Sequence, residues 1–189
     1  MIALSKRWRA IGAVAAVELL VLGGMVWDRV GLLQNGREIE LDVVPVDPRS
    51  LFRGDYVILS YDVSRFDGGK LDGDLAKGRP IYVTIAQDAG GKWQVQRASV
   101  SAKVAASGAE VVLKGRTDRW RFPAARATSP VNVRYGIESY FVPEGTGKAL
   151  EKMVGEKRIK AVVAVGRDGT AALKGLKVDG QLVHKEPVI

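Results

Sequence analysis

The sequence predicts a mainly β fold, with a single barrel-like or sandwich domain that contains one short helix and follows one N-terminal transmembrane helix. Three observations predict it: an apolar stretch near the start, alternating apolar and polar segments after it, and Gly-containing turns between these segments. The 189 residues make one domain once the apolar stretch is set aside. We therefore expect a cytoplasmic N-terminus and anchor over residues 1–29 and an exported β-rich domain over residues 30–189.

The apolar stretch predicts a helix that crosses a membrane. Residues 10–27 read AIGAVAAVELLVLGGMVW, and the only charged residue in this run is Glu18. A run of this length is near the lower limit for crossing a hydrocarbon core of ~30 Å. Trp8 and Trp27 lie at its two ends, where indole rings favour the headgroup level.

The charges beside the stretch predict its orientation. Three basic residues precede it within residues 6–9, whereas Asp28 and Arg29 follow it and cancel. The positive-inside rule then keeps the N-terminus in the cytoplasm and places the C-terminal domain in the periplasm or outside. A cleaved signal peptide is the alternative, but its small-residue site at residues 13–15 would leave almost no apolar run before it.

Glu18 in the middle of the stretch has two interpretations. An acidic residue at this depth costs roughly 2.5–3.5 kcal/mol on insertion scales. Either Glu18 is protonated and the leucine-rich residues 19–22 offset its cost, or its side chain faces a polar group on a partner helix. The sequence leaves both open.

Segments with the period of half-buried strands follow a short join at residues 30–36. Ile39, Leu41 and Val43 alternate with acidic residues. Asp168-Gly169 predicts the turn of a hairpin over residues 158–178. An apolar face at residues 147–155 predicts the short helix. The other expected strand segments are 56–63, 81–85, 93–95, 111–113 and 131–137.

Composition limits the chemistry of the domain. There are no cysteines and one histidine, so thiolate sites and multi-histidine zinc sites are excluded, and we expect no metal and no cofactor. The net charge is +8, but no nucleic-acid-binding module is present, and we expect no nucleic-acid partner. Anionic lipid headgroups are a possible partner for this charge. The basic and aromatic residues interleaved over residues 116–126 suit the headgroup region or a partner surface, or form a solvated loop whose aromatic rings cover the core.

Two segments carry a resemblance to a known family. Residues 45–61 read PVDPRSLFRGDYVILSY, and residues 134–145 read RYGIESYFVPEG. The first contains the string GDYxxLxY, and both resemble the signatures of the bacterial GDYXXLXY protein family, whose usual N-terminal membrane helix also matches. The resemblance implies a membrane-associated protein of the cell envelope, often found beside multi-span membrane proteins. It therefore implies an accessory role and an integral membrane protein as the partner.

The residues of these segments are interpreted in two ways. As structure, they form a turn and a strand with Leu59 and Tyr61 on one face and Ile58 on the other. As a site, their polar side chains bind a partner or ligand. Arg134 and Glu138 are expected on one strand face, where they can pair with the charges of the first segment in exposed ion pairs that contribute ~0–1 kcal/mol. The candidate interaction residues are Asp47, Arg49, Arg53, Asp55, Tyr56, Tyr61, Arg134, Glu138 and Tyr140.

The sequence does not predict an enzyme. The strand entry LFRGDYVIL also resembles that of type I signal peptidases, but Val46 occupies the position of their nucleophilic serine. Ser50 lies on the other side of the turn, and no lysine is marked out as its base. We expect no catalytic residues. The alternatives to an accessory protein are a binding module for a cell-envelope ligand and a diverged signal-peptidase-like hydrolase.

Overall fold

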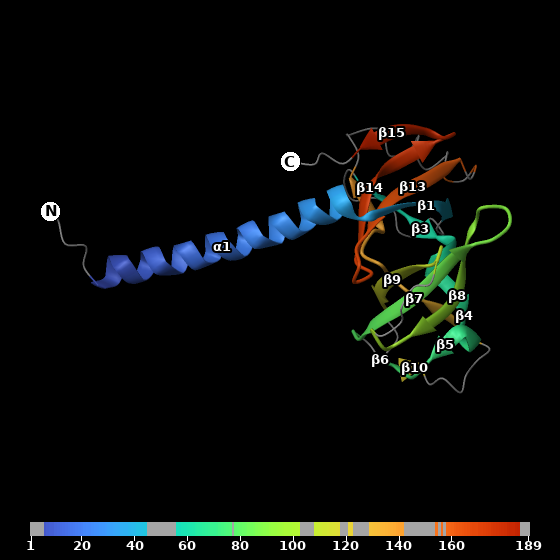
Figure 1. The fold of residues 1–189 in the computed structure, drawn as a ribbon, viewed down its shortest axis with the longest axis horizontal. Coiled ribbons are helices and arrows are strands. Elements are labelled where there is room, and N and C mark those ends of the chain that lie inside the picture. Colours follow the sequence, from blue (N-terminus) through green and yellow to red (C-terminus); the bar gives the residue numbers. More distant parts are fainter. Residues whose placement is uncertain are drawn as a thin grey trace.

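The computed structural model of the chain describes residues 6–44, 56–76, 78–102, 108–117, 121–122, 129–141, 154, 156 and 158–185. Within these ranges one long helix is followed by a domain built almost wholly of strands (Figure 1). The helix is α1 (Lys6–Asn35), and 3-10 turns lie at η1 (Asp62–Ser64) and η2 (Gly68–Lys70). The strands are β1 (Arg37–Val44), β2 (Tyr56–Ile58), β3 (Ser60–Tyr61), β4 (Arg65–Asp67), β5 (Leu71–Asp72), β6 (Leu75–Ala76), β7 (Pro80–Gln87), β8 (Trp93–Ser99), β9 (Val111–Arg116), β10 (Arg121–Phe122), β11 (Pro130–Asn132), β12 (Ser139–Phe141), β13 (Ile159–Val165), β14 (Ala171–Val178) and β15 (Gln181–Lys185).

Helix α1 projects away from the strands for most of its length (Figure 1). It has 30 residues, which correspond to about 45 Å. By length and composition it can cross a membrane, and its most apolar window is 0% buried. The join expected at residues 30–36 is instead helical as far as Asn35. The helix continues because its last turns pack on β13 and β14, where Leu33 is buried.

The strands form two main sheets and three short pairs. The larger sheet has the order β15-β14-β13-β1-β3, and the smaller has the order β5-β8-β7-β9. The pairs are β10-β6, β11-β4 and β12-β2. The sheets are not closed, so the mainly β prediction is confirmed and the domain is not a complete barrel. The predicted hairpin is also present, since β13 and β14 pair from Val165↔Ala171 to Ile159↔Val178.

Strand β1 shows how the sequence period directs burial. Ile39, Leu41 and Val43 are buried, as their alternation predicts. The acidic residues that alternate with them lie on the other side of the strand, where Glu38, just before Ile39, pairs with Lys174 at 2.7 Å. Such exposed pairs contribute ~0–1 kcal/mol, so the buried side of β1 dominates its stability.

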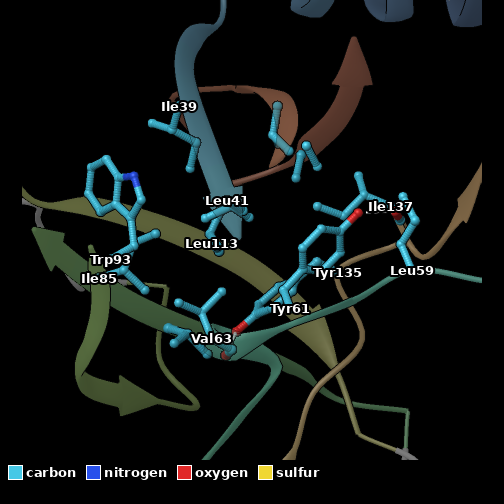
Figure 2. Packing of buried hydrophobic residues seen from close by; sticks show 14 of the residues in the cluster. Ile39, Leu41, Leu59, Tyr61, Val63, Ile85, Trp93, Leu113, Tyr135 and Ile137 are labelled. Atoms are coloured by element: carbon cyan, nitrogen blue, oxygen red, sulfur yellow. Dashed lines mark hydrogen bonds between the residues drawn. The ribbon is translucent and has the colours of Figure 1, made fainter. Parts of the chain in front are cut away.

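One hydrophobic core joins the two sheets. Leu41 of β1 and Leu113 of β9 come from different sheets and lie in the same cluster (Figure 2). Ile81, Val83 and Ile85 of β7 are each 0% exposed. The described strands therefore pack around a shared centre. The short helix expected at 147–155 lies outside the described residues except for Val154, which is helical and buried.

A close contact replaces a linker between the helix and the first strand. The backbone N–H of Gly36 donates to the carbonyl of Leu32 at 2.9 Å, and β1 begins at the next residue. A Cβ atom on Gly36 would lie 2.5 Å from the Leu32 oxygen and 3.0 Å from the Cβ of Ala164. Only glycine fits this joint without displacing backbone.

We predict that Gly36→Ala lowers the free energy of unfolding by about 1–3 kcal/mol, the range for side chains forced into filled space. Thermal unfolding of the full-length chain in detergent, followed by circular dichroism, measures the change. Gly31→Ala is the matched control, because a Cβ there meets nothing within 4 Å. If the two variants melted at the same temperature, the joint would not be as tight as the coordinates show.

Candidate functional site

The two segments singled out from the sequence lie side by side in the fold. Strand β2 pairs with β12 in antiparallel register, and β4 pairs with β11 in the same way. Between these pairs, the N–H of Leu59 donates to the carbonyl of Glu138 at 2.7 Å. The N–H of Val133 donates to the carbonyl of Ser64 at 2.8 Å. Residues 56–67 and 130–141 therefore form one interrupted antiparallel ladder.

Two tyrosines bond across this ladder in opposite directions. The Tyr61 hydroxyl donates to the carbonyl of Ile137 at 2.5 Å. The Tyr135 hydroxyl donates to the carbonyl of Val63 at 2.7 Å. Both rings lie between Ile137 and Val63 (Figure 2), and they are 1% and 6% exposed. Each segment thus supplies one tyrosine that satisfies a buried carbonyl of the other segment.

Burial determines the protonation of these two tyrosines. Removal from water raises the pKa of Tyr61 and the pKa of Tyr135 far above the ordinary value of a phenol, and the nearby carboxylate of Glu138 raises both further. Both hydroxyls therefore remain neutral donors at ordinary pH. Since each proton is already used in a hydrogen bond to a carbonyl, their arrangement is that of structural donors.

Glu138 closes a turn between the ladder strands. Its carboxylate accepts from the backbone N–H of Tyr135 at 2.5 Å and from that of Gly136 at 3.0 Å. Gly136 has φ +82°, a left-handed conformation that side chains disfavour. Burial still alternates along this segment: Arg134 and Gly136 are exposed and Glu138 is half-buried, whereas Val133, Tyr135 and Ile137 are buried. The strand expected over 131–137 is interrupted: β11 ends at Asn132 and β12 begins at Ser139, with the left-handed Gly136 between them.

Comparison with known proteins decides the family. A family model described as GDYXXLXY protein matches residues 18–176. The chain belongs to the GDYXXLXY protein family. The matched range begins inside α1 and includes both segments of the ladder. No curated protein and no solved structure matches the chain.

The GDYXXLXY string is described from its third residue onward. Leu59 and Tyr61 are both 1% exposed, whereas Ile58, the last residue of β2, is 39% exposed. This confirms the predicted division of the strand into an inner and an outer face. Tyr56 pairs through its backbone with Phe141, and its side chain lies outside the described residues.

The remaining GDYXXLXY candidates separate into three groups. Arg134 forms a backbone bridge with Arg116, each N–H donating to the other's carbonyl at 2.8 Å. Tyr140 is 2% exposed, so its ring belongs to the core. The polar turn predicted between β1 and β2 lies outside the described residues, and its role stays a prediction. Its members are Asp47, Arg49, Arg53 and Asp55.

Two residues that position the ladder were missing from the predicted site. Tyr135 lies in the alternating run Val131, Val133, Tyr135, whose period indicated an inward side chain but not its partner. Gly115 of β9 lies under this run. A Cβ atom there would overlap the Val133 side chain and lie 2.8 Å from the Arg134 carbonyl oxygen. A glycine in a strand signals such close approach, although it does not identify the neighbour.

A groove of about 880 Å³ lies where the helix meets the domain. We call it the junction groove. It opens between the end of α1, the start of β1, strand β9 and the β13–β14 turn. Its charged lining residues are Arg37, Glu110, Lys114, Arg167 and Asp168. Among the described residues, no three His, Cys, Asp or Glu side chains gather closely enough to hold a metal ion.

Most charges of the junction groove have partners. The Arg37 guanidinium donates to the carbonyls of Ala109 at 2.9 Å and Glu110 at 2.8 Å. The Glu110 carboxylate binds both terminal nitrogens of Arg97 at 2.9 Å. Lys114 lies 3.9 Å from Asp168. These contacts join the helix end and the two sheets into one rigid rim.

We predict that Tyr61→Phe and Tyr135→Phe each lower the free energy of unfolding by about 1–2 kcal/mol, because each leaves a buried carbonyl without its donor. Urea unfolding followed by circular dichroism measures both. Tyr82→Phe is the matched control, since Tyr82 has no hydrogen bond from its hydroxyl within the described ranges. Stability equal to that of the control would show that the two hydroxyls do not hold the ladder.

Stability is also expected to fall in alkali. The folded state keeps both phenols protonated, whereas the unfolded chain loses these protons above the ordinary pKa of 10.0. The contribution of the two tyrosines is therefore complete below that pH and decreases as pH rises above it. The urea midpoint, measured from about pH 8 to about pH 11, should fall more steeply for the wild type than for Tyr61→Phe/Tyr135→Phe. Parallel curves for the two proteins would contradict this account.

Proposed function

We propose that the protein is a non-enzymatic accessory subunit of the bacterial cell envelope that binds an integral membrane protein. Helix α1 anchors it in the inner membrane, with the N-terminus in the cytoplasm and the β domain in the periplasm or outside. The observation that carries this proposal is the exposed apolar surface of α1. Its side chains from residue 8 to residue 29 are exposed, and its own domain does not cover them.

The exposed surface of α1 is too large for a helix in water. Leu20 is 76% exposed and Trp27 is 81% exposed, and neighbouring apolar side chains are similar. Full burial of one apolar side chain of this size would contribute about 1.5–3 kcal/mol of stabilising free energy, which is lost while the side chain is exposed to water. Contiguous apolar surfaces of this kind are typical of membrane or protein contacts. A bilayer supplies the burial that the domain does not.

Two sequence features support the orientation and the compartment. The basic residues near the N-terminus favour a cytoplasmic start, since no excess of positive charge follows the helix directly. The family resemblance implies membrane association and an accessory role. Both agree with an exported β domain.

Glu18 supports a partner inside the bilayer. It lies midway between Trp8 and Trp27 on an exposed part of α1. A carboxyl group at this depth favours a hydrogen-bonding or basic group on another helix. The domain of this chain lies beyond the end of α1 and does not reach it (Figure 1).

The described part of the ladder supports a binding rather than a catalytic role. Tyr61 and Tyr135 donate to backbone carbonyls, and Glu138 accepts from backbone N–H groups. Each of these polar groups thus has a structural contact. Surface for a partner is available on the outer side of the ladder, for example at Ile58.

We predict that Glu18→Leu reduces crosslinking of the full-length protein to an integral membrane protein in native membranes by about threefold to tenfold, the range for a hydrogen bond between membrane helices. Pull-down after crosslinking and quantitative mass spectrometry measure it. Glu18→Gln, which keeps hydrogen-bonding groups, should retain most of the partner. Val17→Leu is the neutral control on the same helix.

Two further measurements on the same variants test the anchor and the orientation separately from the partner contact. All variants should stay in the membrane after an alkaline wash, and a C-terminal reporter should be active only outside the cytoplasm. Release of the wild type by the wash, or a cytoplasmic reporter, would overturn the anchor and the orientation. Unchanged crosslinking of Glu18→Leu would remove Glu18 from the partner contact.

A further inference from the structure

We propose that the junction groove and the hollow beside it bind the phosphate of an anionic phospholipid headgroup, with Arg29 and Arg167 as the main contacts. This inference rests on the proposed membrane anchor, because the lipid belongs to the leaflet that faces the β domain. The adjoining hollow has a volume of about 480 Å³. It shares Leu32, Gly166 and Asp168 with the junction groove.

The groove lies at the depth of lipid headgroups. The apolar stretch of α1 ends at Trp27, and the first residue that lines the junction groove is Gly31. Four helical residues advance about 6 Å along the axis. The headgroup layer outside the hydrocarbon core is about 5–8 Å thick on each side. A helix that spans the core therefore places this groove among the phosphates.

The groove keeps its position relative to the helix. The last turns of α1 pack on β13 and β14, and the Arg37 guanidinium donates to the backbone carbonyls of Ala109 and Glu110. On the opposite rim, the N–H of Lys114 donates to the carbonyl of Gly169 at 2.8 Å. The β13–β14 turn is thereby fixed on β9. The backbone of the site is therefore preformed, and the ordering cost of binding is limited to side chains such as those of Arg29 and Arg167.

Two positive charges remain at the rim. Arg29 on α1 and Arg167 in the β13–β14 turn are exposed, and within the described ranges neither forms an ion pair. Guanidinium groups bind phosphate through two parallel hydrogen bonds, which suits a lipid phosphodiester. Asp28 also lines the hollow, and its negative charge opposes the positive charge of the adjacent Arg29. Asp168 is the other acidic residue there. Its carboxylate accepts a hydrogen bond from the Thr170 hydroxyl and lies 3.9 Å from the Lys114 ammonium group.

Neighbouring groups keep the carboxylate of Asp168, in the β13–β14 turn, ionised. The Thr170 hydroxyl, then its backbone N–H, and Lys114 lower the pKa of Asp168, so its carboxylate stays ionised and bound within the rim. Arg167, the residue before it in the same turn, is exposed and lines the junction groove. Half-buried Leu32 offers an apolar contact beside these charges. A headgroup needs this combination, because its phosphate is charged and its glycerol and chain carbons are not.

The test titrates full-length protein in detergent with dioleoyl phosphatidylglycerol or dioleoyl phosphatidylcholine and counts bound lipid by native mass spectrometry. We expect the wild type to prefer phosphatidylglycerol. Arg167→Gln should weaken that binding about fivefold, the effect of one basic residue near an anionic surface, and leave phosphatidylcholine binding unchanged. Arg29→Gln should act in the same direction. Arg65→Gln is the charge-matched control, because exposed Arg65 lies on β4, away from α1 (Figure 1).

Three results would overturn the inference. These are equal binding of the two lipids by the wild type, equal loss in Arg167→Gln and Arg65→Gln, and binding of soluble glycerol phosphate as tight as that of phosphatidylglycerol. The last result would assign the groove to a water-soluble anion. An alkaline wash of the membranes from which each protein is purified keeps the two proposals apart. Membrane retention without lipid preference contradicts only this inference, whereas loss of retention contradicts the proposed function.

Discussion

The reciprocal bonds of Tyr61 and Tyr135 hold the centre of the domain. The strands they join, β2, β4, β11 and β12, have three residues each and provide few ladder bonds. Two hydroxyl bonds made away from water compensate for these interruptions, because a buried carbonyl without a donor is costly. The placement of both family segments, and of the core residues around them, depends on this pair. The GDYXXLXY string is in this respect a structural element whose last tyrosine reaches a segment far along the chain.

The elements predicted correctly are those that local patterns encode. The apolar run predicted α1, the alternation of Ile39, Leu41 and Val43 predicted the buried side of β1, and Asp168-Gly169 predicted the β13–β14 turn. In each case the sequence pattern lies within the same few residues as the element that it predicts. The period of two places a side chain inward or outward without knowledge of its partner.

The features that the sequence did not predict depend on contacts between distant residues. Tyr135 was recognisable as inward-facing, but its acceptor, Val63, is 72 residues away in the chain. Glu138 resembled a surface charge because its role in the turn depends on the conformation of Gly136. The junction groove arises only when α1, β9 and the β13–β14 turn meet. No periodic pattern encodes such a meeting, since each part is unremarkable alone.

The close joint at Gly36 links the direction of α1 to that of the β domain, so under the proposed membrane anchor the bilayer would affect how the domain is oriented. The apolar stretch spans about 27 Å as a helix, slightly less than a typical hydrocarbon core, so a thicker bilayer leaves it no slack for tilting. In a thinner bilayer the same helix leans over. Because β1 continues directly from the helix, a change in the tilt of α1 changes the orientation of the β domain in the same direction. Under the proposed membrane anchor, lipid thickness would therefore influence the angle at which the β domain stands on the bilayer.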